Sequence, residues 1–414
     1  QGGPGYASGN AGEPGASGSA VDSDPSHLPA ALQSTAAAKA SQAQGTPVLF
    51  DYLSRPDDDP WYHDRSPYYR VDRIQVPVLI ADGWRDGAFV RGDIEMYEHL
   101  AARRGVETRL IVNPCTHKGC GAPFYPQGPS GVEATQGYEF EFLAHHLRGD
   151  PESRQPPVHY FMQPAGPYVD ATRWPPAGTD LQRLYLRPGA GTAQPAAGSL
   201  APGTLAPQPP AAAATESYFT NPLQGLSTGL NSYGTIAISP YVSPDQRAEE
   251  ASGLTWRTAP YAKATRLAGP LALHLVADSS ATDTDWIARL SDVAPDGSES
   301  VITEGALRAS HRALDPLRST PGSPYHVDRD TQPLVPGTTY SFDVAIIPTA
   351  HELAAGHVLQ LRLTTDDMPT RLPATIAFDR ADPAATRIVP LPPATNTVHE
   401  GGASPSWLVV PVQR

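Results

Sequence analysis

The sequence predicts an incomplete parallel α/β sheet followed by an all-β sandwich, and three observations support this fold class. Between residues 47 and 152, patterns of buried strands alternate with helical patterns, which is typical of a parallel sheet covered by helices. From about residue 155 onward the helical patterns stop, and short strand patterns separated by turns replace them. The length of 414 residues allows about two or three domains.

The predicted α/β part consists of two strands and two helices in alternation. Residues 76–81 and 109–112 are short, continuously apolar runs, which suit strands that are buried on both faces. Residues 89–104 carry apolar side chains at helical spacing, and Gly105 ends this helix. Residues 133–147 predict the second helix, so the order is strand, helix, strand, helix.

The predicted sandwich begins at residue 153 and extends to residue 414. Its strand candidates are 158–162, 181–186, 271–276, 286–293, 300–309, 339–347 and 358–364. The sequence Ala294-Pro-Asp-Gly297 predicts a hairpin turn, because proline presets φ and glycine adopts a positive φ without strain. Residues 188–215 are rich in proline and alanine, and they predict a long surface loop.

Residues 1–46 form a separate segment before the predicted sheet. Residues 1–26 lack large apolar side chains and predict a flexible lead-in, since they bury too little surface to offset chain entropy. Residues 27–44 are rich in alanine and favour one helix. The segment starts with Gln1 and has neither the basic start nor the apolar stretch of a signal peptide. We therefore expect a processed product or a piece of a longer protein.

The charge balance of the chain disfavours two classes of partner. The chain carries 30 basic and 43 acidic side chains, so its formal net charge at pH 7 is −13. Nucleic acids and anionic membrane surfaces are bound through a cationic face. The sequence also contains no run of about 18 apolar residues, the length that spans a bilayer as a helix. We therefore expect neither a nucleic acid nor a membrane as partner.

Two polar loops follow the two buried strands of the predicted sheet. Asp86 follows strand 76–81, and His117 follows strand 109–112. The carboxyl ends of parallel strands lie at the same edge of a sheet, so both side chains belong to one edge. In α/β-hydrolases the triad residues follow one another as Ser, Asp and His, and this pair fits the last two. The alternative is a turn or cap carboxylate at Asp86 and an ordinary loop histidine at 117.

Several segments together resemble the cocaine esterase / Xaa-Pro dipeptidyl-peptidase family of serine hydrolases. The resemblance covers roughly residues 50–370, and the order and spacing of the segments carry it. The matching segments are RSP (65–67), VPVLIADGWRDGAF (76–89), RLIVNPCTH (109–117), LTWRTAPY (254–261), DSSATDTDWIARLSDVAPDGS (278–298), GALRASHR (305–312), LVPGTTYSFDV (334–344) and GHVLQLRL (356–363).

The resemblance implies an α/β-hydrolase domain with an inserted helical cap, and a C-terminal jelly roll beside the active site. On this basis residues 1–46 include a remnant of the cap, 47–152 are the C-terminal half of the hydrolase domain, and 153–414 are the jelly roll. The implied partner is a small ester or peptide substrate, and no cofactor or metal is implied.

The resemblance also assigns residues to the site. Asp86 takes the place of the triad acid and His117 that of the triad base. Trp84 and Phe89 match aromatic positions near the acyl pocket. In relatives that hydrolyse α-amino acid esters, acidic residues closely follow the triad aspartate. Here the residues 87–89 (Gly-Ala-Phe) follow it, which argues against that preference and leaves plain esters and peptides open.

The family's nucleophile is the element that this sequence does not match. In the family the serine lies on a G-x-S-x-G turn before the triad aspartate, and no such turn precedes Asp86. The formal motif Gly225-Leu-Ser227-Thr-Gly229 lacks a buried strand before it and a helix after it, so we interpret it as coincidence. We expect that the chain begins within or near the cap and that the serine lies upstream or is lost.

Two cysteines, Cys115 and Cys120, flank His117. In an oxidising compartment they predict a disulfide that stiffens the histidine loop, and in a reducing one they remain thiols. With His117 they would supply three zinc ligands, but a structural zinc site takes four. We favour the disulfide, which slightly favours a secreted protein; the location and the oligomeric state, including a homodimer, stay open. Asp278, Asp283 and Asp285 could suit calcium, but turn carboxylates are the favoured interpretation.

The sequence therefore predicts a serine hydrolase of ester or amide bonds whose serine is not in this chain. Two alternatives without catalysis stay open. The chain could be a β-sandwich binding module, including a glycan-binding jelly roll, or an inactive remnant of a hydrolase. A G-x-S-x-G turn between a strand and a helix would discriminate the enzyme from both alternatives.

Overall fold

The structure is a computed structural model that describes residues 55, 57–87, 89–115, 131–151, 155–189, 202–220, 253–365, 374–377 and 387–414. The chain divides into two compact units. The first unit comprises residues 1–59 and 374–389, and the second comprises residues 60–373 and 390–414. The predicted lead-in and the helix predicted at 27–44 lie outside the described residues. No helix of the described part is both long and apolar enough to cross a bilayer.

The described part of the first unit contains a two-stranded sheet. It pairs β14 (Ala374–Ala377) with β15 (Arg387–Pro390). In the same unit, Arg55 forms an ion pair with Asp59 at 2.8 Å, one helical turn away in sequence. Neither feature was predicted from the sequence.

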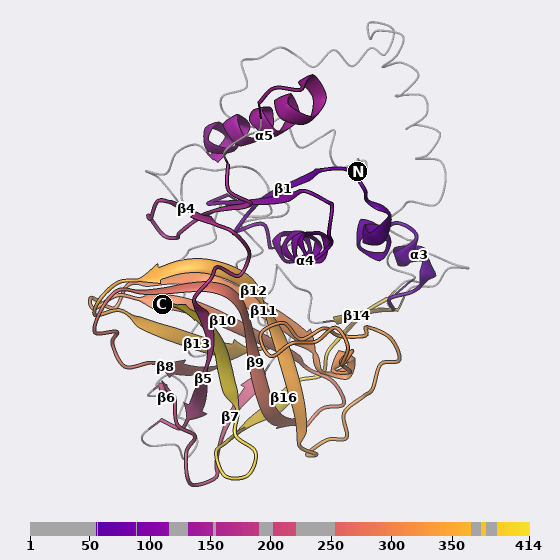
Figure 1. Cartoon of the computed structure of the whole chain (residues 1–414). Helices are drawn as coiled ribbons and strands as arrows, with labels where there is room; N and C mark the ends of the chain where they lie inside the picture. Colours follow the sequence, from indigo (N-terminus) through magenta and orange to yellow (C-terminus); the bar gives the residue numbers. More distant parts are fainter. Residues whose placement is uncertain are drawn as a thin grey trace, which may run out of the picture. The chain divides into compact units, whose positions relative to one another are not determined.

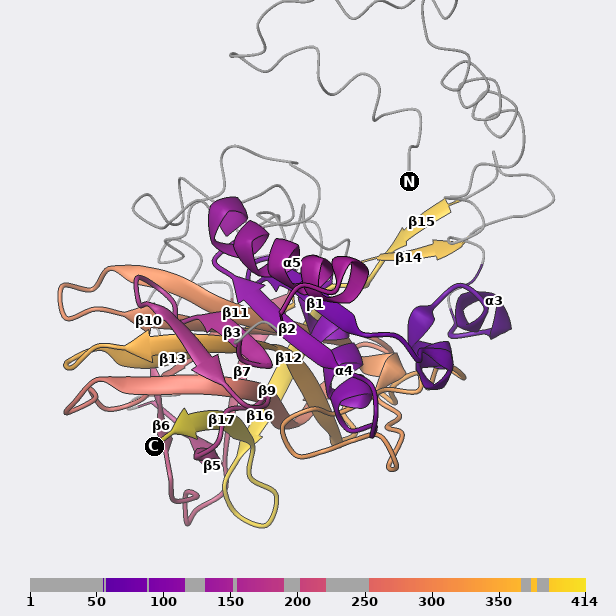
Figure 2. The ribbon, with the colours of Figure 1, turned by 45° about the horizontal axis from the view of Figure 1, so that its top comes forward.

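A small mixed sheet forms one half of the second unit. Its strands lie in chain order, with β1, β2 and β3 parallel and β4 antiparallel to β3. Helices α4 and α5 lie on opposite faces of the sheet, as Figures 1 and 2 show. The elements are β1 (Val78–Gly83), α4 (Val90–Ala101), β2 (Thr108–Asn113), α5 (Gly131–Arg148), β3 (Val158–Phe161) and β4 (Tyr168–Ala171). Before β1 lie the short helices α3 (Pro60–His63) and η2 (Pro67–Arg73).

The structure confirms the two strands and two helices that were predicted for this region. Every residue of β2 is buried, as expected for a central strand that helices cover on both faces. The strand predicted at 158–162 is β3, and it pairs with β2 in this sheet rather than with the strands of the sandwich. Its four residues are all buried, which again fits a parallel strand.

The other half of the second unit is an eleven-stranded β-sheet, which confirms the predicted sandwich. The sheet closes on itself because the long strand β9 also pairs with β12, and Figure 1 shows the resulting barrel-like sandwich. The strands are β5 (Thr179–Arg187), β6 (Gly203–Ala206), β7 (Ala214–Thr220), β8 (Leu254–Arg257), β9 (Thr265–Ser279), β10 (Asp285–Val293), β11 (Glu299–Arg308), β12 (Tyr340–Leu353), β13 (Val358–Thr364), β16 (Ala394–Glu400) and β17 (Trp407–Gln413). A 3₁₀-helix, η5 (Ala309–His311), follows β11.

One prediction about the sandwich was wrong and one was confirmed. The proline- and alanine-rich stretch 188–215 is not a single loop, because β6 and the start of β7 lie within it. Leu205 of β6 is buried and β6 pairs with β5 and β8, which its composition did not reveal. The turn between β10 and β11 forms as predicted, with Gly297 at φ +82° donating from its N–H to the carbonyl oxygen of Ala294.

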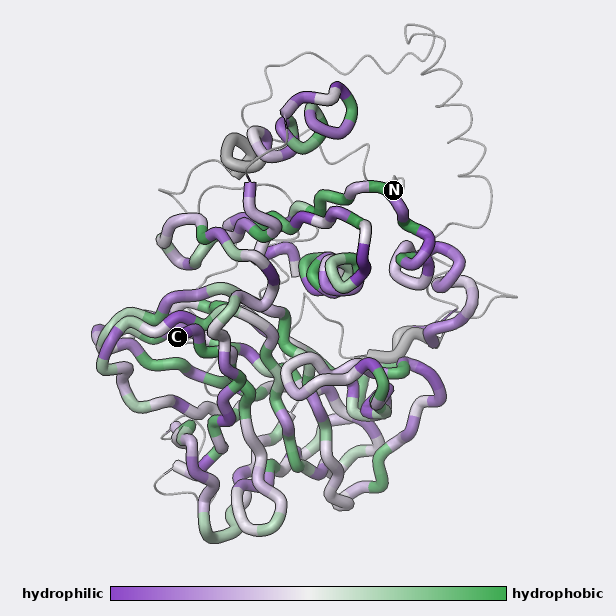
Figure 3. The backbone as a smooth tube through the Cα atoms, viewed as in Figure 1, coloured by the Kyte–Doolittle hydropathy of each residue, from purple (hydrophilic) through white to green (hydrophobic). Residues whose placement is uncertain are grey.

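Two hydrophobic cores hold the second unit together. One fills the closed sheet with large side chains such as Trp256, Trp286 and Phe342. The other joins the small sheet and α4 to the outer face of the large sheet, because it includes both Ile94 and Val301. Figure 3 shows apolar segments recurring along the strands of both sheets. The small sheet is therefore packed against the sandwich through a shared core.

Candidate active site

The loop after β1 packs against the residues that follow β2. The Trp84 N–H donates to the carbonyl oxygen of Asn113 at 2.9 Å, and the Arg85 N–H donates to that of Cys115 at 3.0 Å. A Cβ added to Gly83 would lie 2.2 Å from the Cys115 carbonyl oxygen, so this approach requires glycine. The turn that carries Asp86 is thus fixed against residues 113–115, which precede His117 in sequence. His117 itself lies outside the described residues.

Backbone hydrogen bonds fix Asp86 on both sides. Its N–H donates to the carbonyl oxygen of Gly83 at 2.9 Å. Its own carbonyl oxygen accepts from the N–H groups of Phe89 and Val90, both at 3.1 Å, where α4 begins. The residue is 4% exposed. Asp86 therefore lies at a rigid turn between β1 and α4, at the carboxyl edge of the sheet where the sequence placed it.

Two further carboxyl groups accompany Asp86. Asp82, in β1, and Asp93, in the first turn of α4, share a hydrogen bond between their side chains. Burial, together with the charges of Asp86 and Asp93, raises the pKa of Asp82 to about 8, against the lowering effect of a hydrogen bond from the Gly83 N–H. Burial also raises the pKa of Asp93. At neutral pH this pair holds a proton, so Asp86 faces less negative charge than three ionised carboxylates would give.

The residue before Asp86 links this turn to the large sheet. Arg85 is 5% exposed, and its Nη2 donates to the carbonyl oxygen of Val301 in β11 at 2.8 Å. Its charge also acts on His351 of β12, whose pKa is lowered first by burial and then by Arg85 among other groups. His351 Nε2 lies 2.9 Å from Asp292 Oδ2, and His357 Nδ1 lies 2.7 Å from Asp292 Oδ1. Sequence reasoning missed this polar cluster, because its members come from distant strands.

The two parts of the chain match two descriptions of one family. Residues 153–409, more than half of the chain, match the X-Pro dipeptidyl-peptidase C-terminal non-catalytic domain. Residues 10–119 match the X-Pro dipeptidyl-peptidase of the S15 family. The chain belongs to the cocaine esterase / X-Pro dipeptidyl-peptidase family of serine hydrolases. This confirms the resemblance on which the sequence analysis relied.

Individual known proteins resemble the chain over most of its length. It is 24% identical to the cocaine esterase of a Rhodococcus species over 382 residues, which cover 88% of this chain and 61% of the esterase. The structure of an aminopeptidase from a Thaumarchaeota archaeon is 20% identical with a TM-score of 0.69, covering 89% of this chain and 60% of that one. An α-amino acid ester hydrolase is 20% identical with a TM-score of 0.68, covering 91% and 62%. The chain thus spans about six tenths of the length of these relatives.

The two aromatic residues assigned to the acyl pocket occupy different environments in this family member. Trp84 is 2% exposed, its indole N–H donates to the carbonyl oxygen of Phe161 at 2.7 Å, and its ring packs against Trp174. Phe89 precedes α4 and is 48% exposed. Trp84 thus has a clear role in the core, and the contact of either ring with substrate stays a prediction.

Five further residues were considered in the sequence analysis for a disulfide or for metal binding. Cys115 is disulfide-bonded, and Cys120, the other cysteine of the chain, lies outside the described residues. Asp278, Asp283 and Asp285 bind protein partners, namely His399, Ser310 and Arg308. These contacts fit turn and strand-end carboxylates. Within the described ranges, no group of three or more His, Cys, Asp or Glu side chains is arranged to hold a metal ion.

A cavity of about 660 Å³ opens beside Gly87, the residue after Asp86. Its walls come from α4 and from β11, through Arg91 and Glu304 among others. His311 also lines it, and the hydrogen bond that His311 donates to the Asp328 carboxylate raises the pKa of His311 above its usual value, against the effect of burial. If Asp86 is the triad acid, this cavity with its positive and negative side chains lies next to it.

Proposed function

We propose that this chain is the C-terminal part of a serine hydrolase that cleaves ester or amide bonds, including X-Pro peptide bonds. Asp86 is the triad acid and His117 is the triad base. The small mixed sheet is then the C-terminal half of an α/β-hydrolase domain. The observation that supports this most is the packing of residues 83–85 against residues 113–115, which brings the turn that carries Asp86 next to the residues that precede His117 in sequence.

Each residue has a defined chemical role in this proposal. The Asp86 carboxylate accepts a hydrogen bond from the His117 imidazole, holds its tautomer and stabilises the imidazolium. His117 takes the proton of the serine hydroxyl and returns it to the leaving group, and water resolves the acyl-enzyme by the same route. The serine comes from a segment outside this sequence, because no G-x-S-x-G turn precedes Asp86.

The surroundings of Asp86 support its role. Asp82 and Asp93 hold a proton between them, which leaves less negative charge beside the Asp86 carboxylate than three ionised carboxylates would. The cavity beside Gly87 offers space for a substrate next to the acid. Its polar lining suits the carbonyl and amide groups of esters and peptides.

A fluorophosphonate probe, which labels activated serines, tests the proposal by intact-mass spectrometry. The chain as given should remain unlabelled, while a protein extended by the residues encoded upstream of Gln1 should gain one adduct in the added segment. Circular dichroism must show that both proteins are folded. A stoichiometric adduct within the chain as given, for instance at Ser227, would overturn the assignment of the serine to another segment. A folded extended protein that stays unlabelled would favour the non-catalytic alternative.

A further inference from the structure

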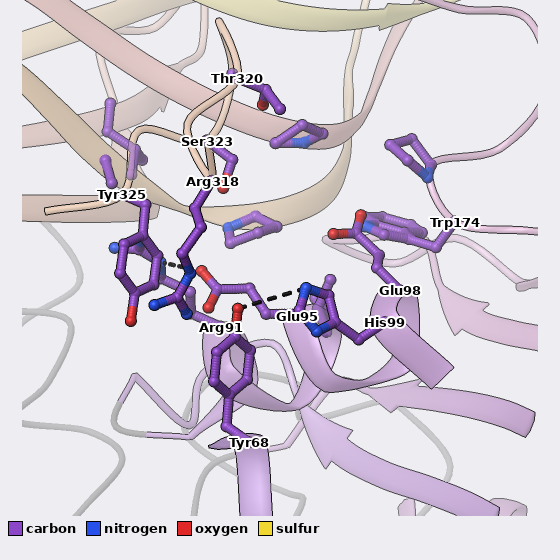
Figure 4. Close-up of a pocket in the computed structure, with 17 residues that line it drawn as sticks. Tyr68, Arg91, Glu95, Glu98, His99, Trp174, Arg318, Thr320, Ser323 and Tyr325 are labelled. Carbon is purple, nitrogen blue, oxygen red and sulfur yellow. Dashed lines mark hydrogen bonds and ion pairs between the residues drawn. The ribbon is translucent and has the colours of Figure 1, made fainter. Parts of the chain in front are cut away.

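A second cavity lies between α4 and the loop that follows η5. Its volume is about 240 Å³. Ligand pockets commonly measure about 300–1,000 Å³, so this one has room only for a small molecule. Pro175, Pro270 and Ile346 give it apolar walls, while charged side chains enter from α4 and from the loop. Figure 4 shows these groups around the cavity.

One side of the cavity carries a carboxylate that lacks a cation. Glu98 and Trp174 both line the cavity (Figure 4), and no hydrogen bond or ion pair to the Glu98 carboxylate occurs within the part of the chain that the structure describes. Burial and, to a smaller extent, the charge of Glu95 raise the pKa of Glu98 to about 7. An ammonium group at this position would relieve both effects, since an opposite charge favours the ionised carboxylate.

The other side carries a guanidinium that lacks a carboxylate. Arg318 lies 3.3 Å from the ring centroid of Tyr325 and 4.7 Å from that of Tyr68. The guanidinium hydrogen-bonds to the hydroxyl groups of Tyr68 and Tyr69, its Nη2 is buried without an acceptor, and no carboxylate pairs with it among the described residues. A planar guanidinium held on aromatic rings is well suited to bind a carboxylate through two parallel hydrogen bonds. This side of the cavity therefore fits an anion.

The charges between these two sides cancel each other. Arg91 Nε lies 2.9 Å from Glu95 Oε1, and Arg91 Nη2 donates to the carbonyl oxygen of Pro324 at 3.2 Å. Figure 4 shows Arg318 with Tyr325 on one side, Glu98 with Trp174 on the other, and Glu95 between them. The cavity thus presents one uncompensated negative group and one uncompensated positive group, separated by a neutral pair and bordered by apolar walls.

We propose that this cavity binds a small zwitterion, such as an amino acid, with its ammonium group at Glu98 and its carboxylate at Arg318. The apolar walls contact the carbon chain between the two charges. The inference does not depend on the proposed hydrolase activity, because it rests on the lining of this cavity alone. A molecule with the same carbon chain but only one charged end would leave either Glu98 or Arg318 without a counter-ion.

Isothermal titration calorimetry of the whole chain with three matched probes tests this inference. The probes are 5-aminopentanoate, pentanoate and pentylamine, which share one carbon chain and differ in charge. The zwitterion should bind about tenfold or more tightly than either singly charged probe, because each charge-assisted hydrogen bond adds affinity. Equal affinity for the three probes, preference for a singly charged one, or no binding of 5-aminopentanoate by the folded chain would each overturn the proposal.

Variants assign the two ends of the ligand. Glu98→Gln should weaken 5-aminopentanoate binding about tenfold and leave pentanoate binding unaffected. Arg318→Gln should also weaken 5-aminopentanoate binding about tenfold, but it should leave pentylamine binding unaffected. Arg318→Lys keeps the charge and serves as the second variant if Arg318→Gln does not fold. Arg266→Gln is the matched control, because Arg266 pairs with Glu352 on an exposed surface outside this cavity. Unchanged binding in the folded Glu98 and Arg318 variants would contradict the assignment.

Discussion

The guanidinium group of Arg85 donates a hydrogen bond to the main-chain carbonyl oxygen of Val301 at 2.8 Å, although 216 positions separate the two residues in sequence. Both residues are buried, and Val301 belongs to the core that the small sheet shares with the sandwich. Arg85 also directly precedes Asp86, whose backbone begins α4. The large sheet therefore holds the turn that carries the candidate acid.

Replacing Arg85 should destabilise the second unit. Arg85→Gln removes a charged donor from a buried carbonyl oxygen, which should lower the free energy of unfolding by about 1.5–3 kcal/mol. Urea titration followed by tryptophan fluorescence measures this change. Arg183→Gln is a matched control, because Arg183 stacks over Trp407 away from the Asp86 turn. An Arg85→Gln protein as stable as the original would show that the hydrogen bond to Val301 does not hold the turn.

The proposed triad predicts large kinetic effects in the extended protein, to which the proposal assigns the serine. Asp86→Asn or His117→Ala should lower turnover by about 10³-fold or more, because the base then loses its orientation or is absent. Ester hydrolysis under saturating substrate measures the effect. Asp150→Asn is the control, since the Asp150 carboxylate is half-exposed and pairs with Arg148. Turnover within a few-fold of the original in either triad variant would refute the assignment.

The cluster of Asp82, Asp86 and Asp93 predicts an unusual titration of Asp82 in the 414-residue chain. Carbon-13 NMR of the aspartate carboxyl groups should show a midpoint near pH 8 for Asp82, since burial and the charges of Asp86 and Asp93 oppose its ionisation. Asp93→Asn should lower this midpoint, because it removes one of those charges. Asp64→Asn, at an exposed pair with Arg70, should leave it in place. A midpoint for Asp82 near 4 in the original protein would contradict the shared proton.

The elements that the sequence predicted correctly are those with a local signal. The runs 76–81 and 109–112 are apolar without interruption, and both became strands of the small sheet. The position of Asp86 after the first of them placed it at the carboxyl edge, since that follows from strand direction alone. Strand β6 was missed because its buried position depends on pairing with β5 and β8, not on its composition.

The site residues that sequence reasoning missed depend on contacts between distant segments. Arg85 is one residue from Asp86, but only the approach of β11 makes it a buried donor. Asp82 and Asp93 carried a partial signal, since one ends the apolar run and the other lies in the first helical turn. Their shared hydrogen bond and raised pKa values follow from burial, which a spacing of eleven residues does not indicate.

The disulfide predicted between Cys115 and Cys120 can be tested chemically. Iodoacetamide under denaturing, non-reducing conditions should leave the chain mass unchanged, and prior reduction should add two carbamidomethyl groups, one for each cysteine. Closing so short a loop stabilises the folded chain by about 2 kcal/mol, so reduction should lower the midpoint of thermal unfolding. Alkylation of either cysteine before reduction would refute the pairing.

A buried carboxyl pair in the sandwich predicts a loss of stability at alkaline pH. Glu400 is fully buried and accepts a hydrogen bond from the Trp256 indole N–H at 2.5 Å. Burial and the charge of Glu216 raise the pKa of Glu400 to about 8, whereas an unfolded glutamate titrates near 4.5. The folded state therefore keeps a proton that the unfolded state releases. The stability that this retained proton gives to the folded state is complete below pH 4.5 and is lost as the pH rises through about 8.

Glu400→Gln should remove most of this dependence, because glutamine keeps the shape and stays neutral at every pH. One retained proton changes the free energy of unfolding by up to about 1.4 kcal/mol per pH unit. Between pH 5 and pH 8 the original protein should therefore lose stability more steeply than the variant. Urea titrations at several pH values measure both slopes, with Glu352→Gln, at an exposed pair with Arg266, as the control. Parallel slopes for the original and Glu400→Gln proteins would show that Glu400 does not retain the proton.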